Sequence, residues 1–238
     1  MSPHGPVLLV DEDAGIRKVV ARTLTSAGID VVPVPDGASA RAALDSGGLA
    51  MVLLDVNLPD VSGLDLVDEI HERYTVPVVI LSVVDEEADI VRALESGADD
   101  YIRKPFSIRE LAARVQSVLR RSAQLDQMRG APLNVGELTL DTSSYRVRVG
   151  NESISLTPTE YRLLAYMVRN ARTVLSHDRL LASVWGAGYE GEHHMLHVTI
   201  SRLRQKLAKL SHAAMIRTAP GAGYKFVPEA SPGAGDAT

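Results

Sequence analysis

The chain has 238 residues, of which 45% are hydrophobic, with 25 Lys and Arg, 30 Asp and Glu, and no cysteine. This length predicts one or two domains, and the lack of cysteine excludes a disulfide framework and thiol chemistry. The N-terminal residues have neither the basic region of a signal peptide nor an apolar run that could span a membrane, so we expect a soluble, cytoplasmic protein.

The two halves of the chain differ in charge. Residues 1–121 contain 12 Lys and Arg against 20 Asp and Glu, a net charge of -8, whereas residues 122–238 contain 13 against 10, a net charge of +3. We therefore predict an acidic domain over residues 1–121, with a metal or phosphate site, and a basic domain over residues 133–228, with a polyanion as partner. Residues 122–132 read as a polar linker and residues 229–238 as a disordered tail.

In the first half, short runs of Val, Leu and Ile alternate with segments of helical spacing. The apolar runs cover residues 7–10, 31–34, 51–54, 76–81 and 100–102. Gly28, Gly47 and Gly97 stand where the helices between these runs would end. Apolar strands that alternate with helices predict a parallel sheet covered on both faces. The expected fold class is α/β, a flavodoxin-like, doubly wound, five-stranded parallel sheet.

Polar residues follow these strands at the carboxyl edge of the predicted sheet, where open sheets of this kind bind ligands. They are Asp11, Glu12 and Asp13 after the first strand, Asp55 after the third, Ser82 after the fourth and Lys104 after the fifth. Crowded carboxylates repel one another unless a cation is present, and oxygen ligands favour Mg²⁺. An Asp carboxylate can also accept a phosphoryl group, so we predict Asp55 as the acceptor, with Lys104 and Ser82 contacting the phosphoryl oxygens.

Each of these residues, taken alone, has an ordinary structural explanation. An Asp after a strand most often caps a helix or lies in a turn, and we expect Asp13 to be such a cap. Ser82 alone would be a turn serine, and Lys104 alone a solvated surface lysine. The ordered set of residues at four strand ends favours a phosphoryl site over these separate explanations.

Four stretches in the first half are similar to those of a known family. They are VLLVDEDAGIR, LLDVNLPDVSG, VVILSVVDE and ESGADDYIRKPF, and with them residues 5–121 resemble the receiver domain of two-component response regulators. The resemblance implies that a sensor histidine kinase phosphorylates Asp55, and that Glu12, Asp55 and the carbonyl of Asn57 bind Mg²⁺ with help from Asp11. It also implies that Ser82 and Tyr101 act as switch residues.

The same resemblance implies a homodimer that forms on activation. Members of the family pair through charged contacts, and the pair of Asp100 and Arg114 is retained here. Ile90 replaces the basic residue that would meet Glu110, and we expect this loss to weaken the dimer rather than prevent it, because exposed ion pairs contribute about 0–1 kcal/mol each.

The second half predicts a small α+β domain. The segments ELTLD, YRVRV and SISL read as antiparallel strands, with Gly150 and Asn151 as a turn. Thr157, Pro158 and Glu160 mark the start of a capped helix, and Ser176 caps a shorter one. A third helix in EGEHHMLHVTISRLRQKLAKL precedes a β-hairpin in IRTAPGAGYKF. Three helices followed by a hairpin predict a winged helix-turn-helix.

The third helix is expected to be amphipathic. Its inner face would hold Leu196, Ile200, Leu203 and Leu207, and its outer face Thr199, Arg202, Lys206 and Lys209. Such a basic helix can enter the major groove of DNA, although charge alone is explained equally well by a solvated helix.

A second resemblance favours DNA. The stretches LTPTEYRLLAYMVRN, VLSHDRLLASVWG, HVTISRLRQKL and APGAGYKF resemble the effector domain of the OmpR/PhoB family over residues 133–228. It implies a phosphorylation-controlled transcription regulator, with double-stranded DNA and RNA polymerase as partners. The positions implied for the DNA surface are Trp185, His194, Val198, Thr199, Ser201, Arg202, Arg204, Lys206, Thr218 and Lys225.

This sequence departs from that family pattern. His194 and Met195 replace an Arg-Thr pair, and Ser201 and Pro220 each replace an Arg. Since each phosphate contact adds about 0.9 to the logarithmic salt slope of DNA binding, we expect weaker and less salt-dependent binding than in a typical member.

Three alternatives remain open from the sequence. His193 and His197 share one helical face and admit a metal site, although a polar helix start explains them more simply. A phosphatase that forms an aspartyl phosphate is a second possibility, but Asn57 cannot act as the general acid it would need. A regulator of the same fold that works without phosphorylation is the third.

Overall fold

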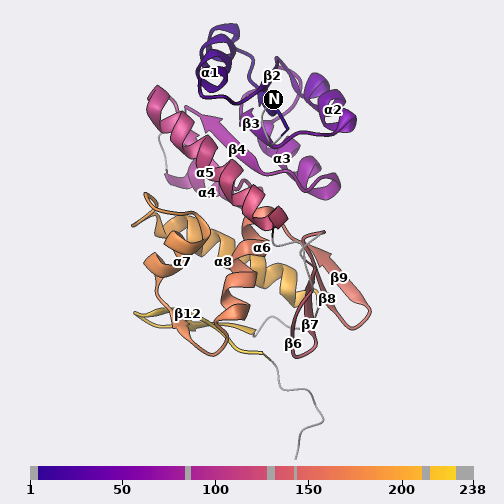
Figure 1. The fold of residues 1–238 in the computed structure, drawn as a ribbon, viewed down its shortest axis with the longest axis vertical. Coiled ribbons are helices and arrows are strands. Elements are labelled where there is room, and N and C mark those ends of the chain that lie inside the picture. The colour runs from indigo at the N-terminus through magenta and orange to yellow at the C-terminus, as the bar shows by residue number, and fades with distance from the viewer. Residues whose placement is uncertain (1–4, 84–86, 128–131, 142–143, 211–214, 229–238) are drawn as a thin grey trace, which may run out of the picture. The chain divides into compact units, whose positions relative to one another are not determined.

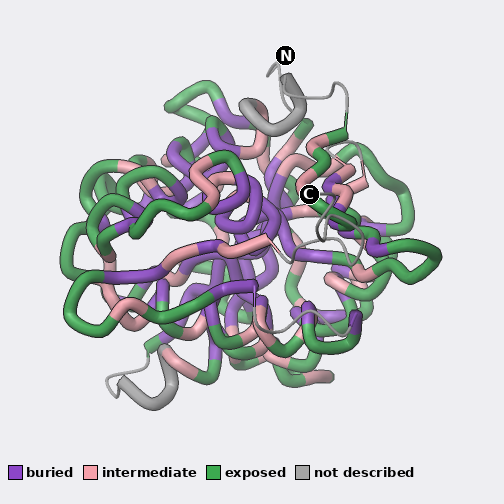
Figure 2. Tube along the Cα trace, turned by 90° about the horizontal axis from the view of Figure 1, so that it is seen from below, coloured by how far each residue is buried: buried purple, intermediate pink, exposed green. Residues whose placement is uncertain are grey.

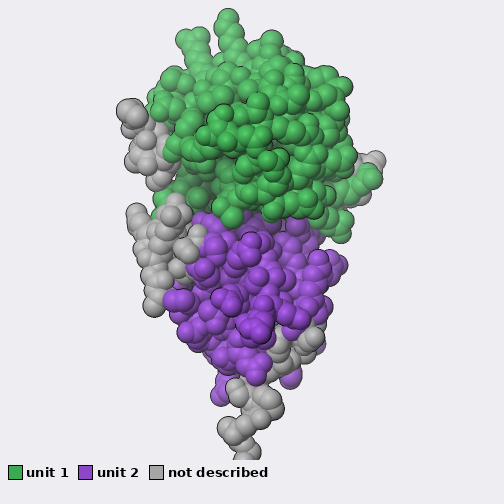
Figure 3. Space-filling view, turned by 90° about the vertical axis from the view of Figure 1, so that its right-hand side faces the viewer, with its two compact units in different colours: residues 1–124 green, residues 125–238 purple. Residues whose placement is uncertain are grey.

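The computed structural model describes residues 5–83, 87–127, 132–141, 144–210 and 215–228 (Figure 1). The chain divides into two compact units, residues 1–124 and 125–238, which Figure 3 shows in different colours. The tail expected at residues 229–238 and the side chain of Ile90 lie outside the described residues. No helix within the described ranges is long and apolar enough to cross a membrane.

The first unit contains the predicted five-stranded parallel sheet. The strands are β1 (Val7–Val10), β2 (Val31–Val34), β3 (Met51–Asp55), β4 (Val78–Ser82) and β5 (Asp100–Arg103). Their order in the sheet is β2-β1-β3-β4-β5, and every neighbouring pair is parallel. In sequence order the chain moves from β1 outward to β2 and then returns to β3 on the other side of β1. The doubly wound α/β fold is therefore confirmed.

Helices cover both faces of this sheet. They are α1 (Ala14–Ser26), α2 (Gly37–Ser46), α3 (Gly63–Arg73), α4 (Glu87–Glu95) and α5 (Ile108–Gln127). Asp13 is the predicted N-cap, since its carboxylate accepts hydrogen bonds from the backbone N–H groups of Gly15 and Ile16. We expected a linker from residue 122, but α5 continues to Gln127. No Gly or Pro interrupts residues 122–127, so nothing in the chain ends the helix there.

The core of the first unit lies in two layers, one on each face of the sheet. Side chains alternate along β1, so that Val7 and Leu9 enter one apolar cluster and Leu8 and Val10 enter the other. The first cluster includes residues of α1 and α5, and the second includes residues of α2 and α3. Figure 2 shows buried residues in the interior and exposed ones on the outer turns. A strand buried on both faces leaves only its end open to solvent.

The second unit is the predicted winged helix-turn-helix. Its elements are β6 (Leu133–Val135), β7 (Leu138–Asp141), β8 (Arg146–Val149), β9 (Glu152–Ser155), α6 (Pro158–Arg169), β10 (Val174–Leu175), α7 (His177–Val184), α8 (His193–Ala208), β11 (Ile216–Ala219) and β12 (Gly223–Phe226). The first four strands form an antiparallel sheet in chain order, and the last three form a second sheet in the order β10-β12-β11. We did not predict β6 and β10, because strands of three and two residues give little alternation to detect.

Local signals in the sequence explain the boundaries of the helices in this unit. Thr157 and Glu160 form the predicted capping box at the start of α6. Ser176 caps α7 through a hydrogen bond from the backbone N–H of Arg179. The hairpin of β11 and β12 is the wing, and Gly223 lies so close to the carbonyl oxygen of Leu175 that a Cβ atom at this position would clash with it. The glycine therefore allows β12 to pair with β10.

Candidate phosphoryl-acceptor site and DNA-binding surface

The ends of β1, β3 and β5 bring an ammonium group and two carboxylates together. The Nζ atom of Lys104 lies 2.7 Å from Asp11 Oδ2 and 2.7 Å from Asp55 Oδ2. All three side chains are buried. Because a buried charge is costly unless it is paired, one ammonium between two carboxylates stabilises this arrangement only in part and leaves a net charge of -1.

Backbone contacts fix the position of each of these side chains. Asp11 Oδ1 accepts a hydrogen bond from the backbone N–H of Asp13 at 2.9 Å, and Asp55 Oδ1 accepts one from Asn57 at 3.3 Å. The backbone N–H of Lys104 donates to the carbonyl of Ser82 at 2.6 Å, which joins the ends of β4 and β5. The peptide bond between Lys104 and Pro105 is cis. The site is thus held by the sheet and by the first turns after it.

Ser82 lies beside this group of charges, and Tyr101 lies on the neighbouring strand β5. Ser82 is buried as the last residue of β4, and its hydroxyl oxygen has no hydrogen-bond partner among the described residues. A buried hydroxyl without a partner costs about 1–3 kcal/mol, so this group is available to a ligand that reaches it. Tyr101 on β5 is half-buried against the apolar cluster formed by α2, α3 and the sheet.

The residues at this edge fit a divalent cation with a preference for oxygen. Asp11 and Asp55 offer carboxylate oxygens with one uncompensated negative charge, and Glu12 and Asn57 are exposed at the rim. These are the ligand types that Mg²⁺ prefers. As the side chains stand, no three acidic or histidine residues in the described ranges form a group that could hold a metal ion. The choice of metal ligands therefore stays a prediction.

In the second unit, α8 and the wing are tied to each other by Arg204. Its guanidinium donates to the carbonyl of Ile216 from Nε at 3.1 Å and from Nη2 at 3.0 Å, and Nη2 also donates to Thr218 Oγ1 at 2.9 Å. The same guanidinium lies 5.5 Å from the centre of the Tyr224 ring. A helix and a wing joined in this way form one continuous surface.

Each of the two units matches a known protein family. Residues 7–116 match the family described as "Response regulator receiver domain", and residues 150–226 match "Transcriptional regulatory protein, C terminal". The sensory transduction protein RegX3 of Mycobacterium tuberculosis is 38% identical over 222 residues, which cover 92% of this chain and 98% of RegX3. The transcriptional regulatory protein TrcR of the same species is 40% identical over 224 residues, which cover 93% of this chain and 86% of TrcR. A RitR mutant of known structure has a TM-score of 0.79 at 28% identity, covering 94% of this chain and all of that one. The chain belongs to the OmpR/PhoB family of response regulators.

This response regulator is a two-component transcription regulator with a DNA-binding output domain. Two residues expected on its DNA surface are buried instead. Trp185 is 1% exposed and Thr199 is 8% exposed. The hydroxyl of Thr199 donates to the carbonyl of Met195, inside α8. Placing Thr199 on the outer face was wrong, because it lies next to the apolar stripe of the helix rather than opposite to it.

Two further residues that were expected to contact DNA phosphates form ion pairs with Glu160 within the unit. Lys206 Nζ lies 2.6 Å from Glu160 Oε2, and Arg202 Nε lies 3.1 Å from Glu160 Oε1. Glu160 is buried at the start of α6. Burial alone would raise the pKa of Glu160, but the charges of Lys206 and Arg202, with hydrogen bonds from Lys206 and the backbone of Thr157, outweigh it and lower the pKa. The two basic residues therefore dock α8 on α6.

The outer face of α8 is less basic than the sequence suggested. Ser201 is exposed, and His194 and Val198 are half-buried. Our sequence reasoning missed Gln205 and Arg217, which are also exposed. A helical wheel would have placed Gln205 opposite the apolar stripe of α8. Arg217 lies across from Lys225 in the wing, which gives two basic residues on neighbouring strands.

The residues expected at the dimer interface are joined within one chain. Arg114 Nη1 lies 3.3 Å from Asp100 Oδ1, and Arg114 Nε lies 3.5 Å from Glu110 Oε1. A dimer that used these residues would have to replace the ion pairs within each chain by pairs between subunits, or form both at once. The dimer contacts therefore stay a prediction.

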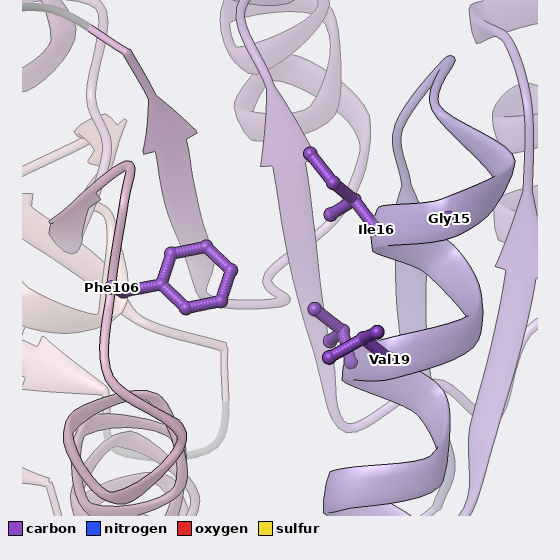
Figure 4. A pocket seen from close by; sticks show the side chains of 5 residues that line it. Gly15, Ile16, Val19 and Phe106 are labelled. Carbon is purple, nitrogen blue, oxygen red and sulfur yellow. The ribbon is translucent and has the colours of Figure 1, made fainter.

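An apolar pocket lies beside the acidic site on the first unit (Figure 4). It has a volume of about 180 Å³ and is lined by Gly15, Ile16, Val19, Val20 and Phe106. Phe106 follows Lys104 by two residues, and Val19 is 53% exposed on α1. In Figure 4 the side chains of Ile16 and Val19 extend from α1 toward Phe106. An exposed apolar surface of this kind suits contact with another protein.

Proposed function

We propose that this response regulator accepts a phosphoryl group on Asp55 from a sensor histidine kinase, with Mg²⁺ as cofactor, and then binds double-stranded DNA as a homodimer. The observation that carries the proposal is the buried ammonium of Lys104 held between Asp11 and Asp55. This group supplies a nucleophile and a cation at one point, which is what phosphoryl transfer requires of a protein.

In the proposed reaction, a carboxylate oxygen of Asp55 attacks the phosphorus atom of a phosphohistidine. A phosphorus–oxygen bond forms, and the phosphorus–nitrogen bond breaks in line with it. Lys104 stabilises the negative charge on the transferring oxygens, and Asp11 keeps the ammonium in place. Mg²⁺ held by Asp11, Glu12, Asp55 and the carbonyl of Asn57 would neutralise further charge on the same oxygens.

Ser82 would be the first residue to respond to phosphorylation of Asp55. Its hydroxyl, which has no hydrogen-bond partner among the described residues, can donate to a phosphoryl oxygen. Tyr101 on the next strand would then move inward toward the space that Ser82 leaves. A hydrogen bond to a charged group contributes about 1.5–3 kcal/mol, whereas inverting a 1:99 equilibrium requires about 5.5 kcal/mol. Lys104 and dimerisation must therefore supply the remainder.

The pocket beside the site supports a protein as the phosphoryl donor. Ile16, Val19 and Phe106 offer apolar contact next to Asp55 and Lys104, so a kinase docked there would present its phosphohistidine to the carboxylate. The proposal places the protein in the cytoplasm, where both a kinase domain and DNA are accessible. A contact with RNA polymerase is part of the same proposal.

Incubation with Mg²⁺ and acetyl phosphate tests the proposal, because a small donor bypasses the unknown kinase. Intact-mass spectrometry should show one added phosphoryl group on the wild-type chain and none on Asp55→Asn. Binding to promoter DNA should increase only in the wild type. If the wild type gained no phosphoryl mass, the chain would be a regulator that works without phosphorylation.

A further inference from the structure

A cluster of three histidines joins α7 to α8 in the second unit, far in sequence from the acidic site. The ring centres of His177 and His193 are 5.2 Å apart, those of His177 and His197 are 5.3 Å apart, and those of His193 and His197 are 6.4 Å apart. His177 is the first residue of α7, and the other two lie one turn apart at the start of α8. None of the three takes part in the proposed phosphoryl transfer.

We propose that His177, His193 and His197 bind one divalent transition-metal ion of the Zn²⁺ type. Two His residues four positions apart on a helix share one face and can bind a metal together. Here a third imidazole from the neighbouring helix completes three nitrogen ligands, which leaves a fourth position for water.

The spacing of the rings is close to that of a coordinated set. Zn²⁺ binds an imidazole nitrogen at about 2.0 Å and a ring centre lies about 1.2 Å behind it, so tetrahedral coordination separates ring centres by about 5.2 Å. Two of the three observed separations have this value, and that between His193 and His197 is wider. As they stand, the three rings do not form a metal-binding group, so binding requires the rings to rotate. His197 is exposed and the other two are half-buried, which leaves room for this rotation.

Asp178 provides the outer support that metal-binding histidines usually have. Its Oδ1 atom lies 3.0 Å from Nε2 of His193. A carboxylate that accepts a hydrogen bond from one ring nitrogen orients the ring and leaves the other nitrogen free for the metal. In His193 the free atom is Nδ1.

A metal at this place would link the two helices of the helix-turn-helix. Tyr224 of the wing also lies against the cluster, with its ring centre 5.5 Å from that of His177. The ion would therefore fix α7, α8 and the wing as one body. It would differ from the Mg²⁺ of the first unit, because nitrogen ligands select transition metals and oxygen ligands select Mg²⁺.

Titration of the full-length protein with ZnCl₂, in buffer containing excess Mg²⁺, tests this inference by calorimetry. We expect one Zn²⁺ per chain, and at least tenfold weaker binding in each of His177→Gln, His193→Gln and His197→Gln. His194→Gln is the matched control, because His194 lies on the same helix outside the cluster. The affinity of this variant for Zn²⁺ should equal that of the wild type. Asp178→Asn should weaken binding about tenfold.

Two results would overturn the inference. One is wild-type protein that binds no Zn²⁺ in the micromolar range, and the other is equal affinity in the wild type and in His177→Gln. Thermal unfolding of each variant without metal shows whether it folds, and we expect it to fold because these side chains are not in the core. Co²⁺ provides a second measurement, since its tetrahedral complexes absorb visible light and the absorption should be lost in His197→Gln. Both measurements are independent of phosphorylation and of DNA.

Discussion

Lys104 is the residue on which the acidic site depends most. Its single ammonium contacts both Asp11 and Asp55, so its removal leaves two carboxylates with no cation between them. We expect Lys104→Ala to fold, with Mg²⁺ compensating part of the lost charge, and to accept the phosphoryl group about 10²–10³ times more slowly. The rate of mass gain from acetyl phosphate measures this. A variant as fast as the wild type would show that Lys104 serves stability alone.

Gly63 at the start of α3 controls the position of Asp55. A Cβ atom on Gly63 would clash with the backbone carbonyl of Asp55. We expect Gly63→Ala to destabilise the first unit by about 1–3 kcal/mol and to slow phosphoryl acceptance, because the strand end must shift. Urea unfolding and the mass assay measure the two effects.

Gly47→Ala is the comparison for this prediction. Gly47 has a φ of 72°, and an added Cβ atom would meet nothing within 4 Å. It should cost about 1–3 kcal/mol from backbone strain alone, with no change in phosphoryl acceptance. Equal loss of acceptance in both variants would contradict a specific role for Gly63.

Single residues were predictable from the sequence where a strand end fixes them. Asp11, Asp55 and Lys104 were identified because the carboxyl ends of parallel strands meet at one edge. Thr199 and Trp185 were misplaced because their burial depends on how a helix is rotated against its neighbours, and polarity gives that rotation only roughly. That the Ser82 hydroxyl has no hydrogen-bond partner within the described ranges depends on distances that no sequence pattern contains.

At the scale of elements, the contact between α6 and α8 depends on Glu160. Its carboxylate is buried and paired with Arg202 and Lys206. We expect Glu160→Gln to destabilise the second unit by about 3 kcal/mol, because the two cations lose their partner. Urea unfolding measures this change. Glu152→Gln, at an exposed position on β9, should stay within about 0.5 kcal/mol of the wild type, and a similar loss in both would contradict the prediction.

The same carboxylate predicts how stability depends on pH. The pKa of Glu160 is lower in the folded chain than its ordinary value. The contribution of Glu160 is therefore complete above about pH 4.3, its pKa in an unfolded chain, and is lost as pH falls through the lower folded value. Acid unfolding of the second unit should be less steep in Glu160→Gln, as circular dichroism would measure. An unchanged profile would show that other groups govern acid unfolding.

The wing predicts which cations determine the salt dependence of DNA binding. Arg217 is exposed, whereas Arg202 is engaged by Glu160. If the wing contacts phosphates, Arg217→Ala should reduce the logarithmic salt slope by about 0.9. Arg202→Gln should reduce stability and leave the slope unchanged. Fluorescence anisotropy at several salt concentrations measures the slope, and the reverse result would show that α8 releases Arg202 on binding DNA.

At the scale of the whole molecule, the sequence correctly predicted an α/β unit followed by an α+β unit. Alternation of strands and helices, capping signals and turn glycines act locally, so the predicted elements were largely right. The length of α5 was underestimated, because a polar composition does not distinguish a linker from an exposed helix. The dimer is not predictable in this way, since Asp100 and Arg114 are joined within the chain.

Phosphorylation should change the assembly of the full chain. We expect the wild type treated with acetyl phosphate and Mg²⁺ to shift from monomer to dimer in light scattering, and Asp55→Asn to remain a monomer. The shift should need high protein concentration, because Ile90 replaces a basic partner of Glu110. A tight dimer before phosphorylation would contradict this prediction.

The position of Asp55 at the end of β3 determines where movement can occur. β3 is hydrogen-bonded to β1 on one side and to β4 on the other, and its side chains are buried on both faces. The backbone of β3 therefore cannot move when Asp55 gains the negative charge of a phosphoryl group. Rearrangement must begin in the segments beyond the strand ends, and amide hydrogen exchange should change there while the amides of β3 stay protected.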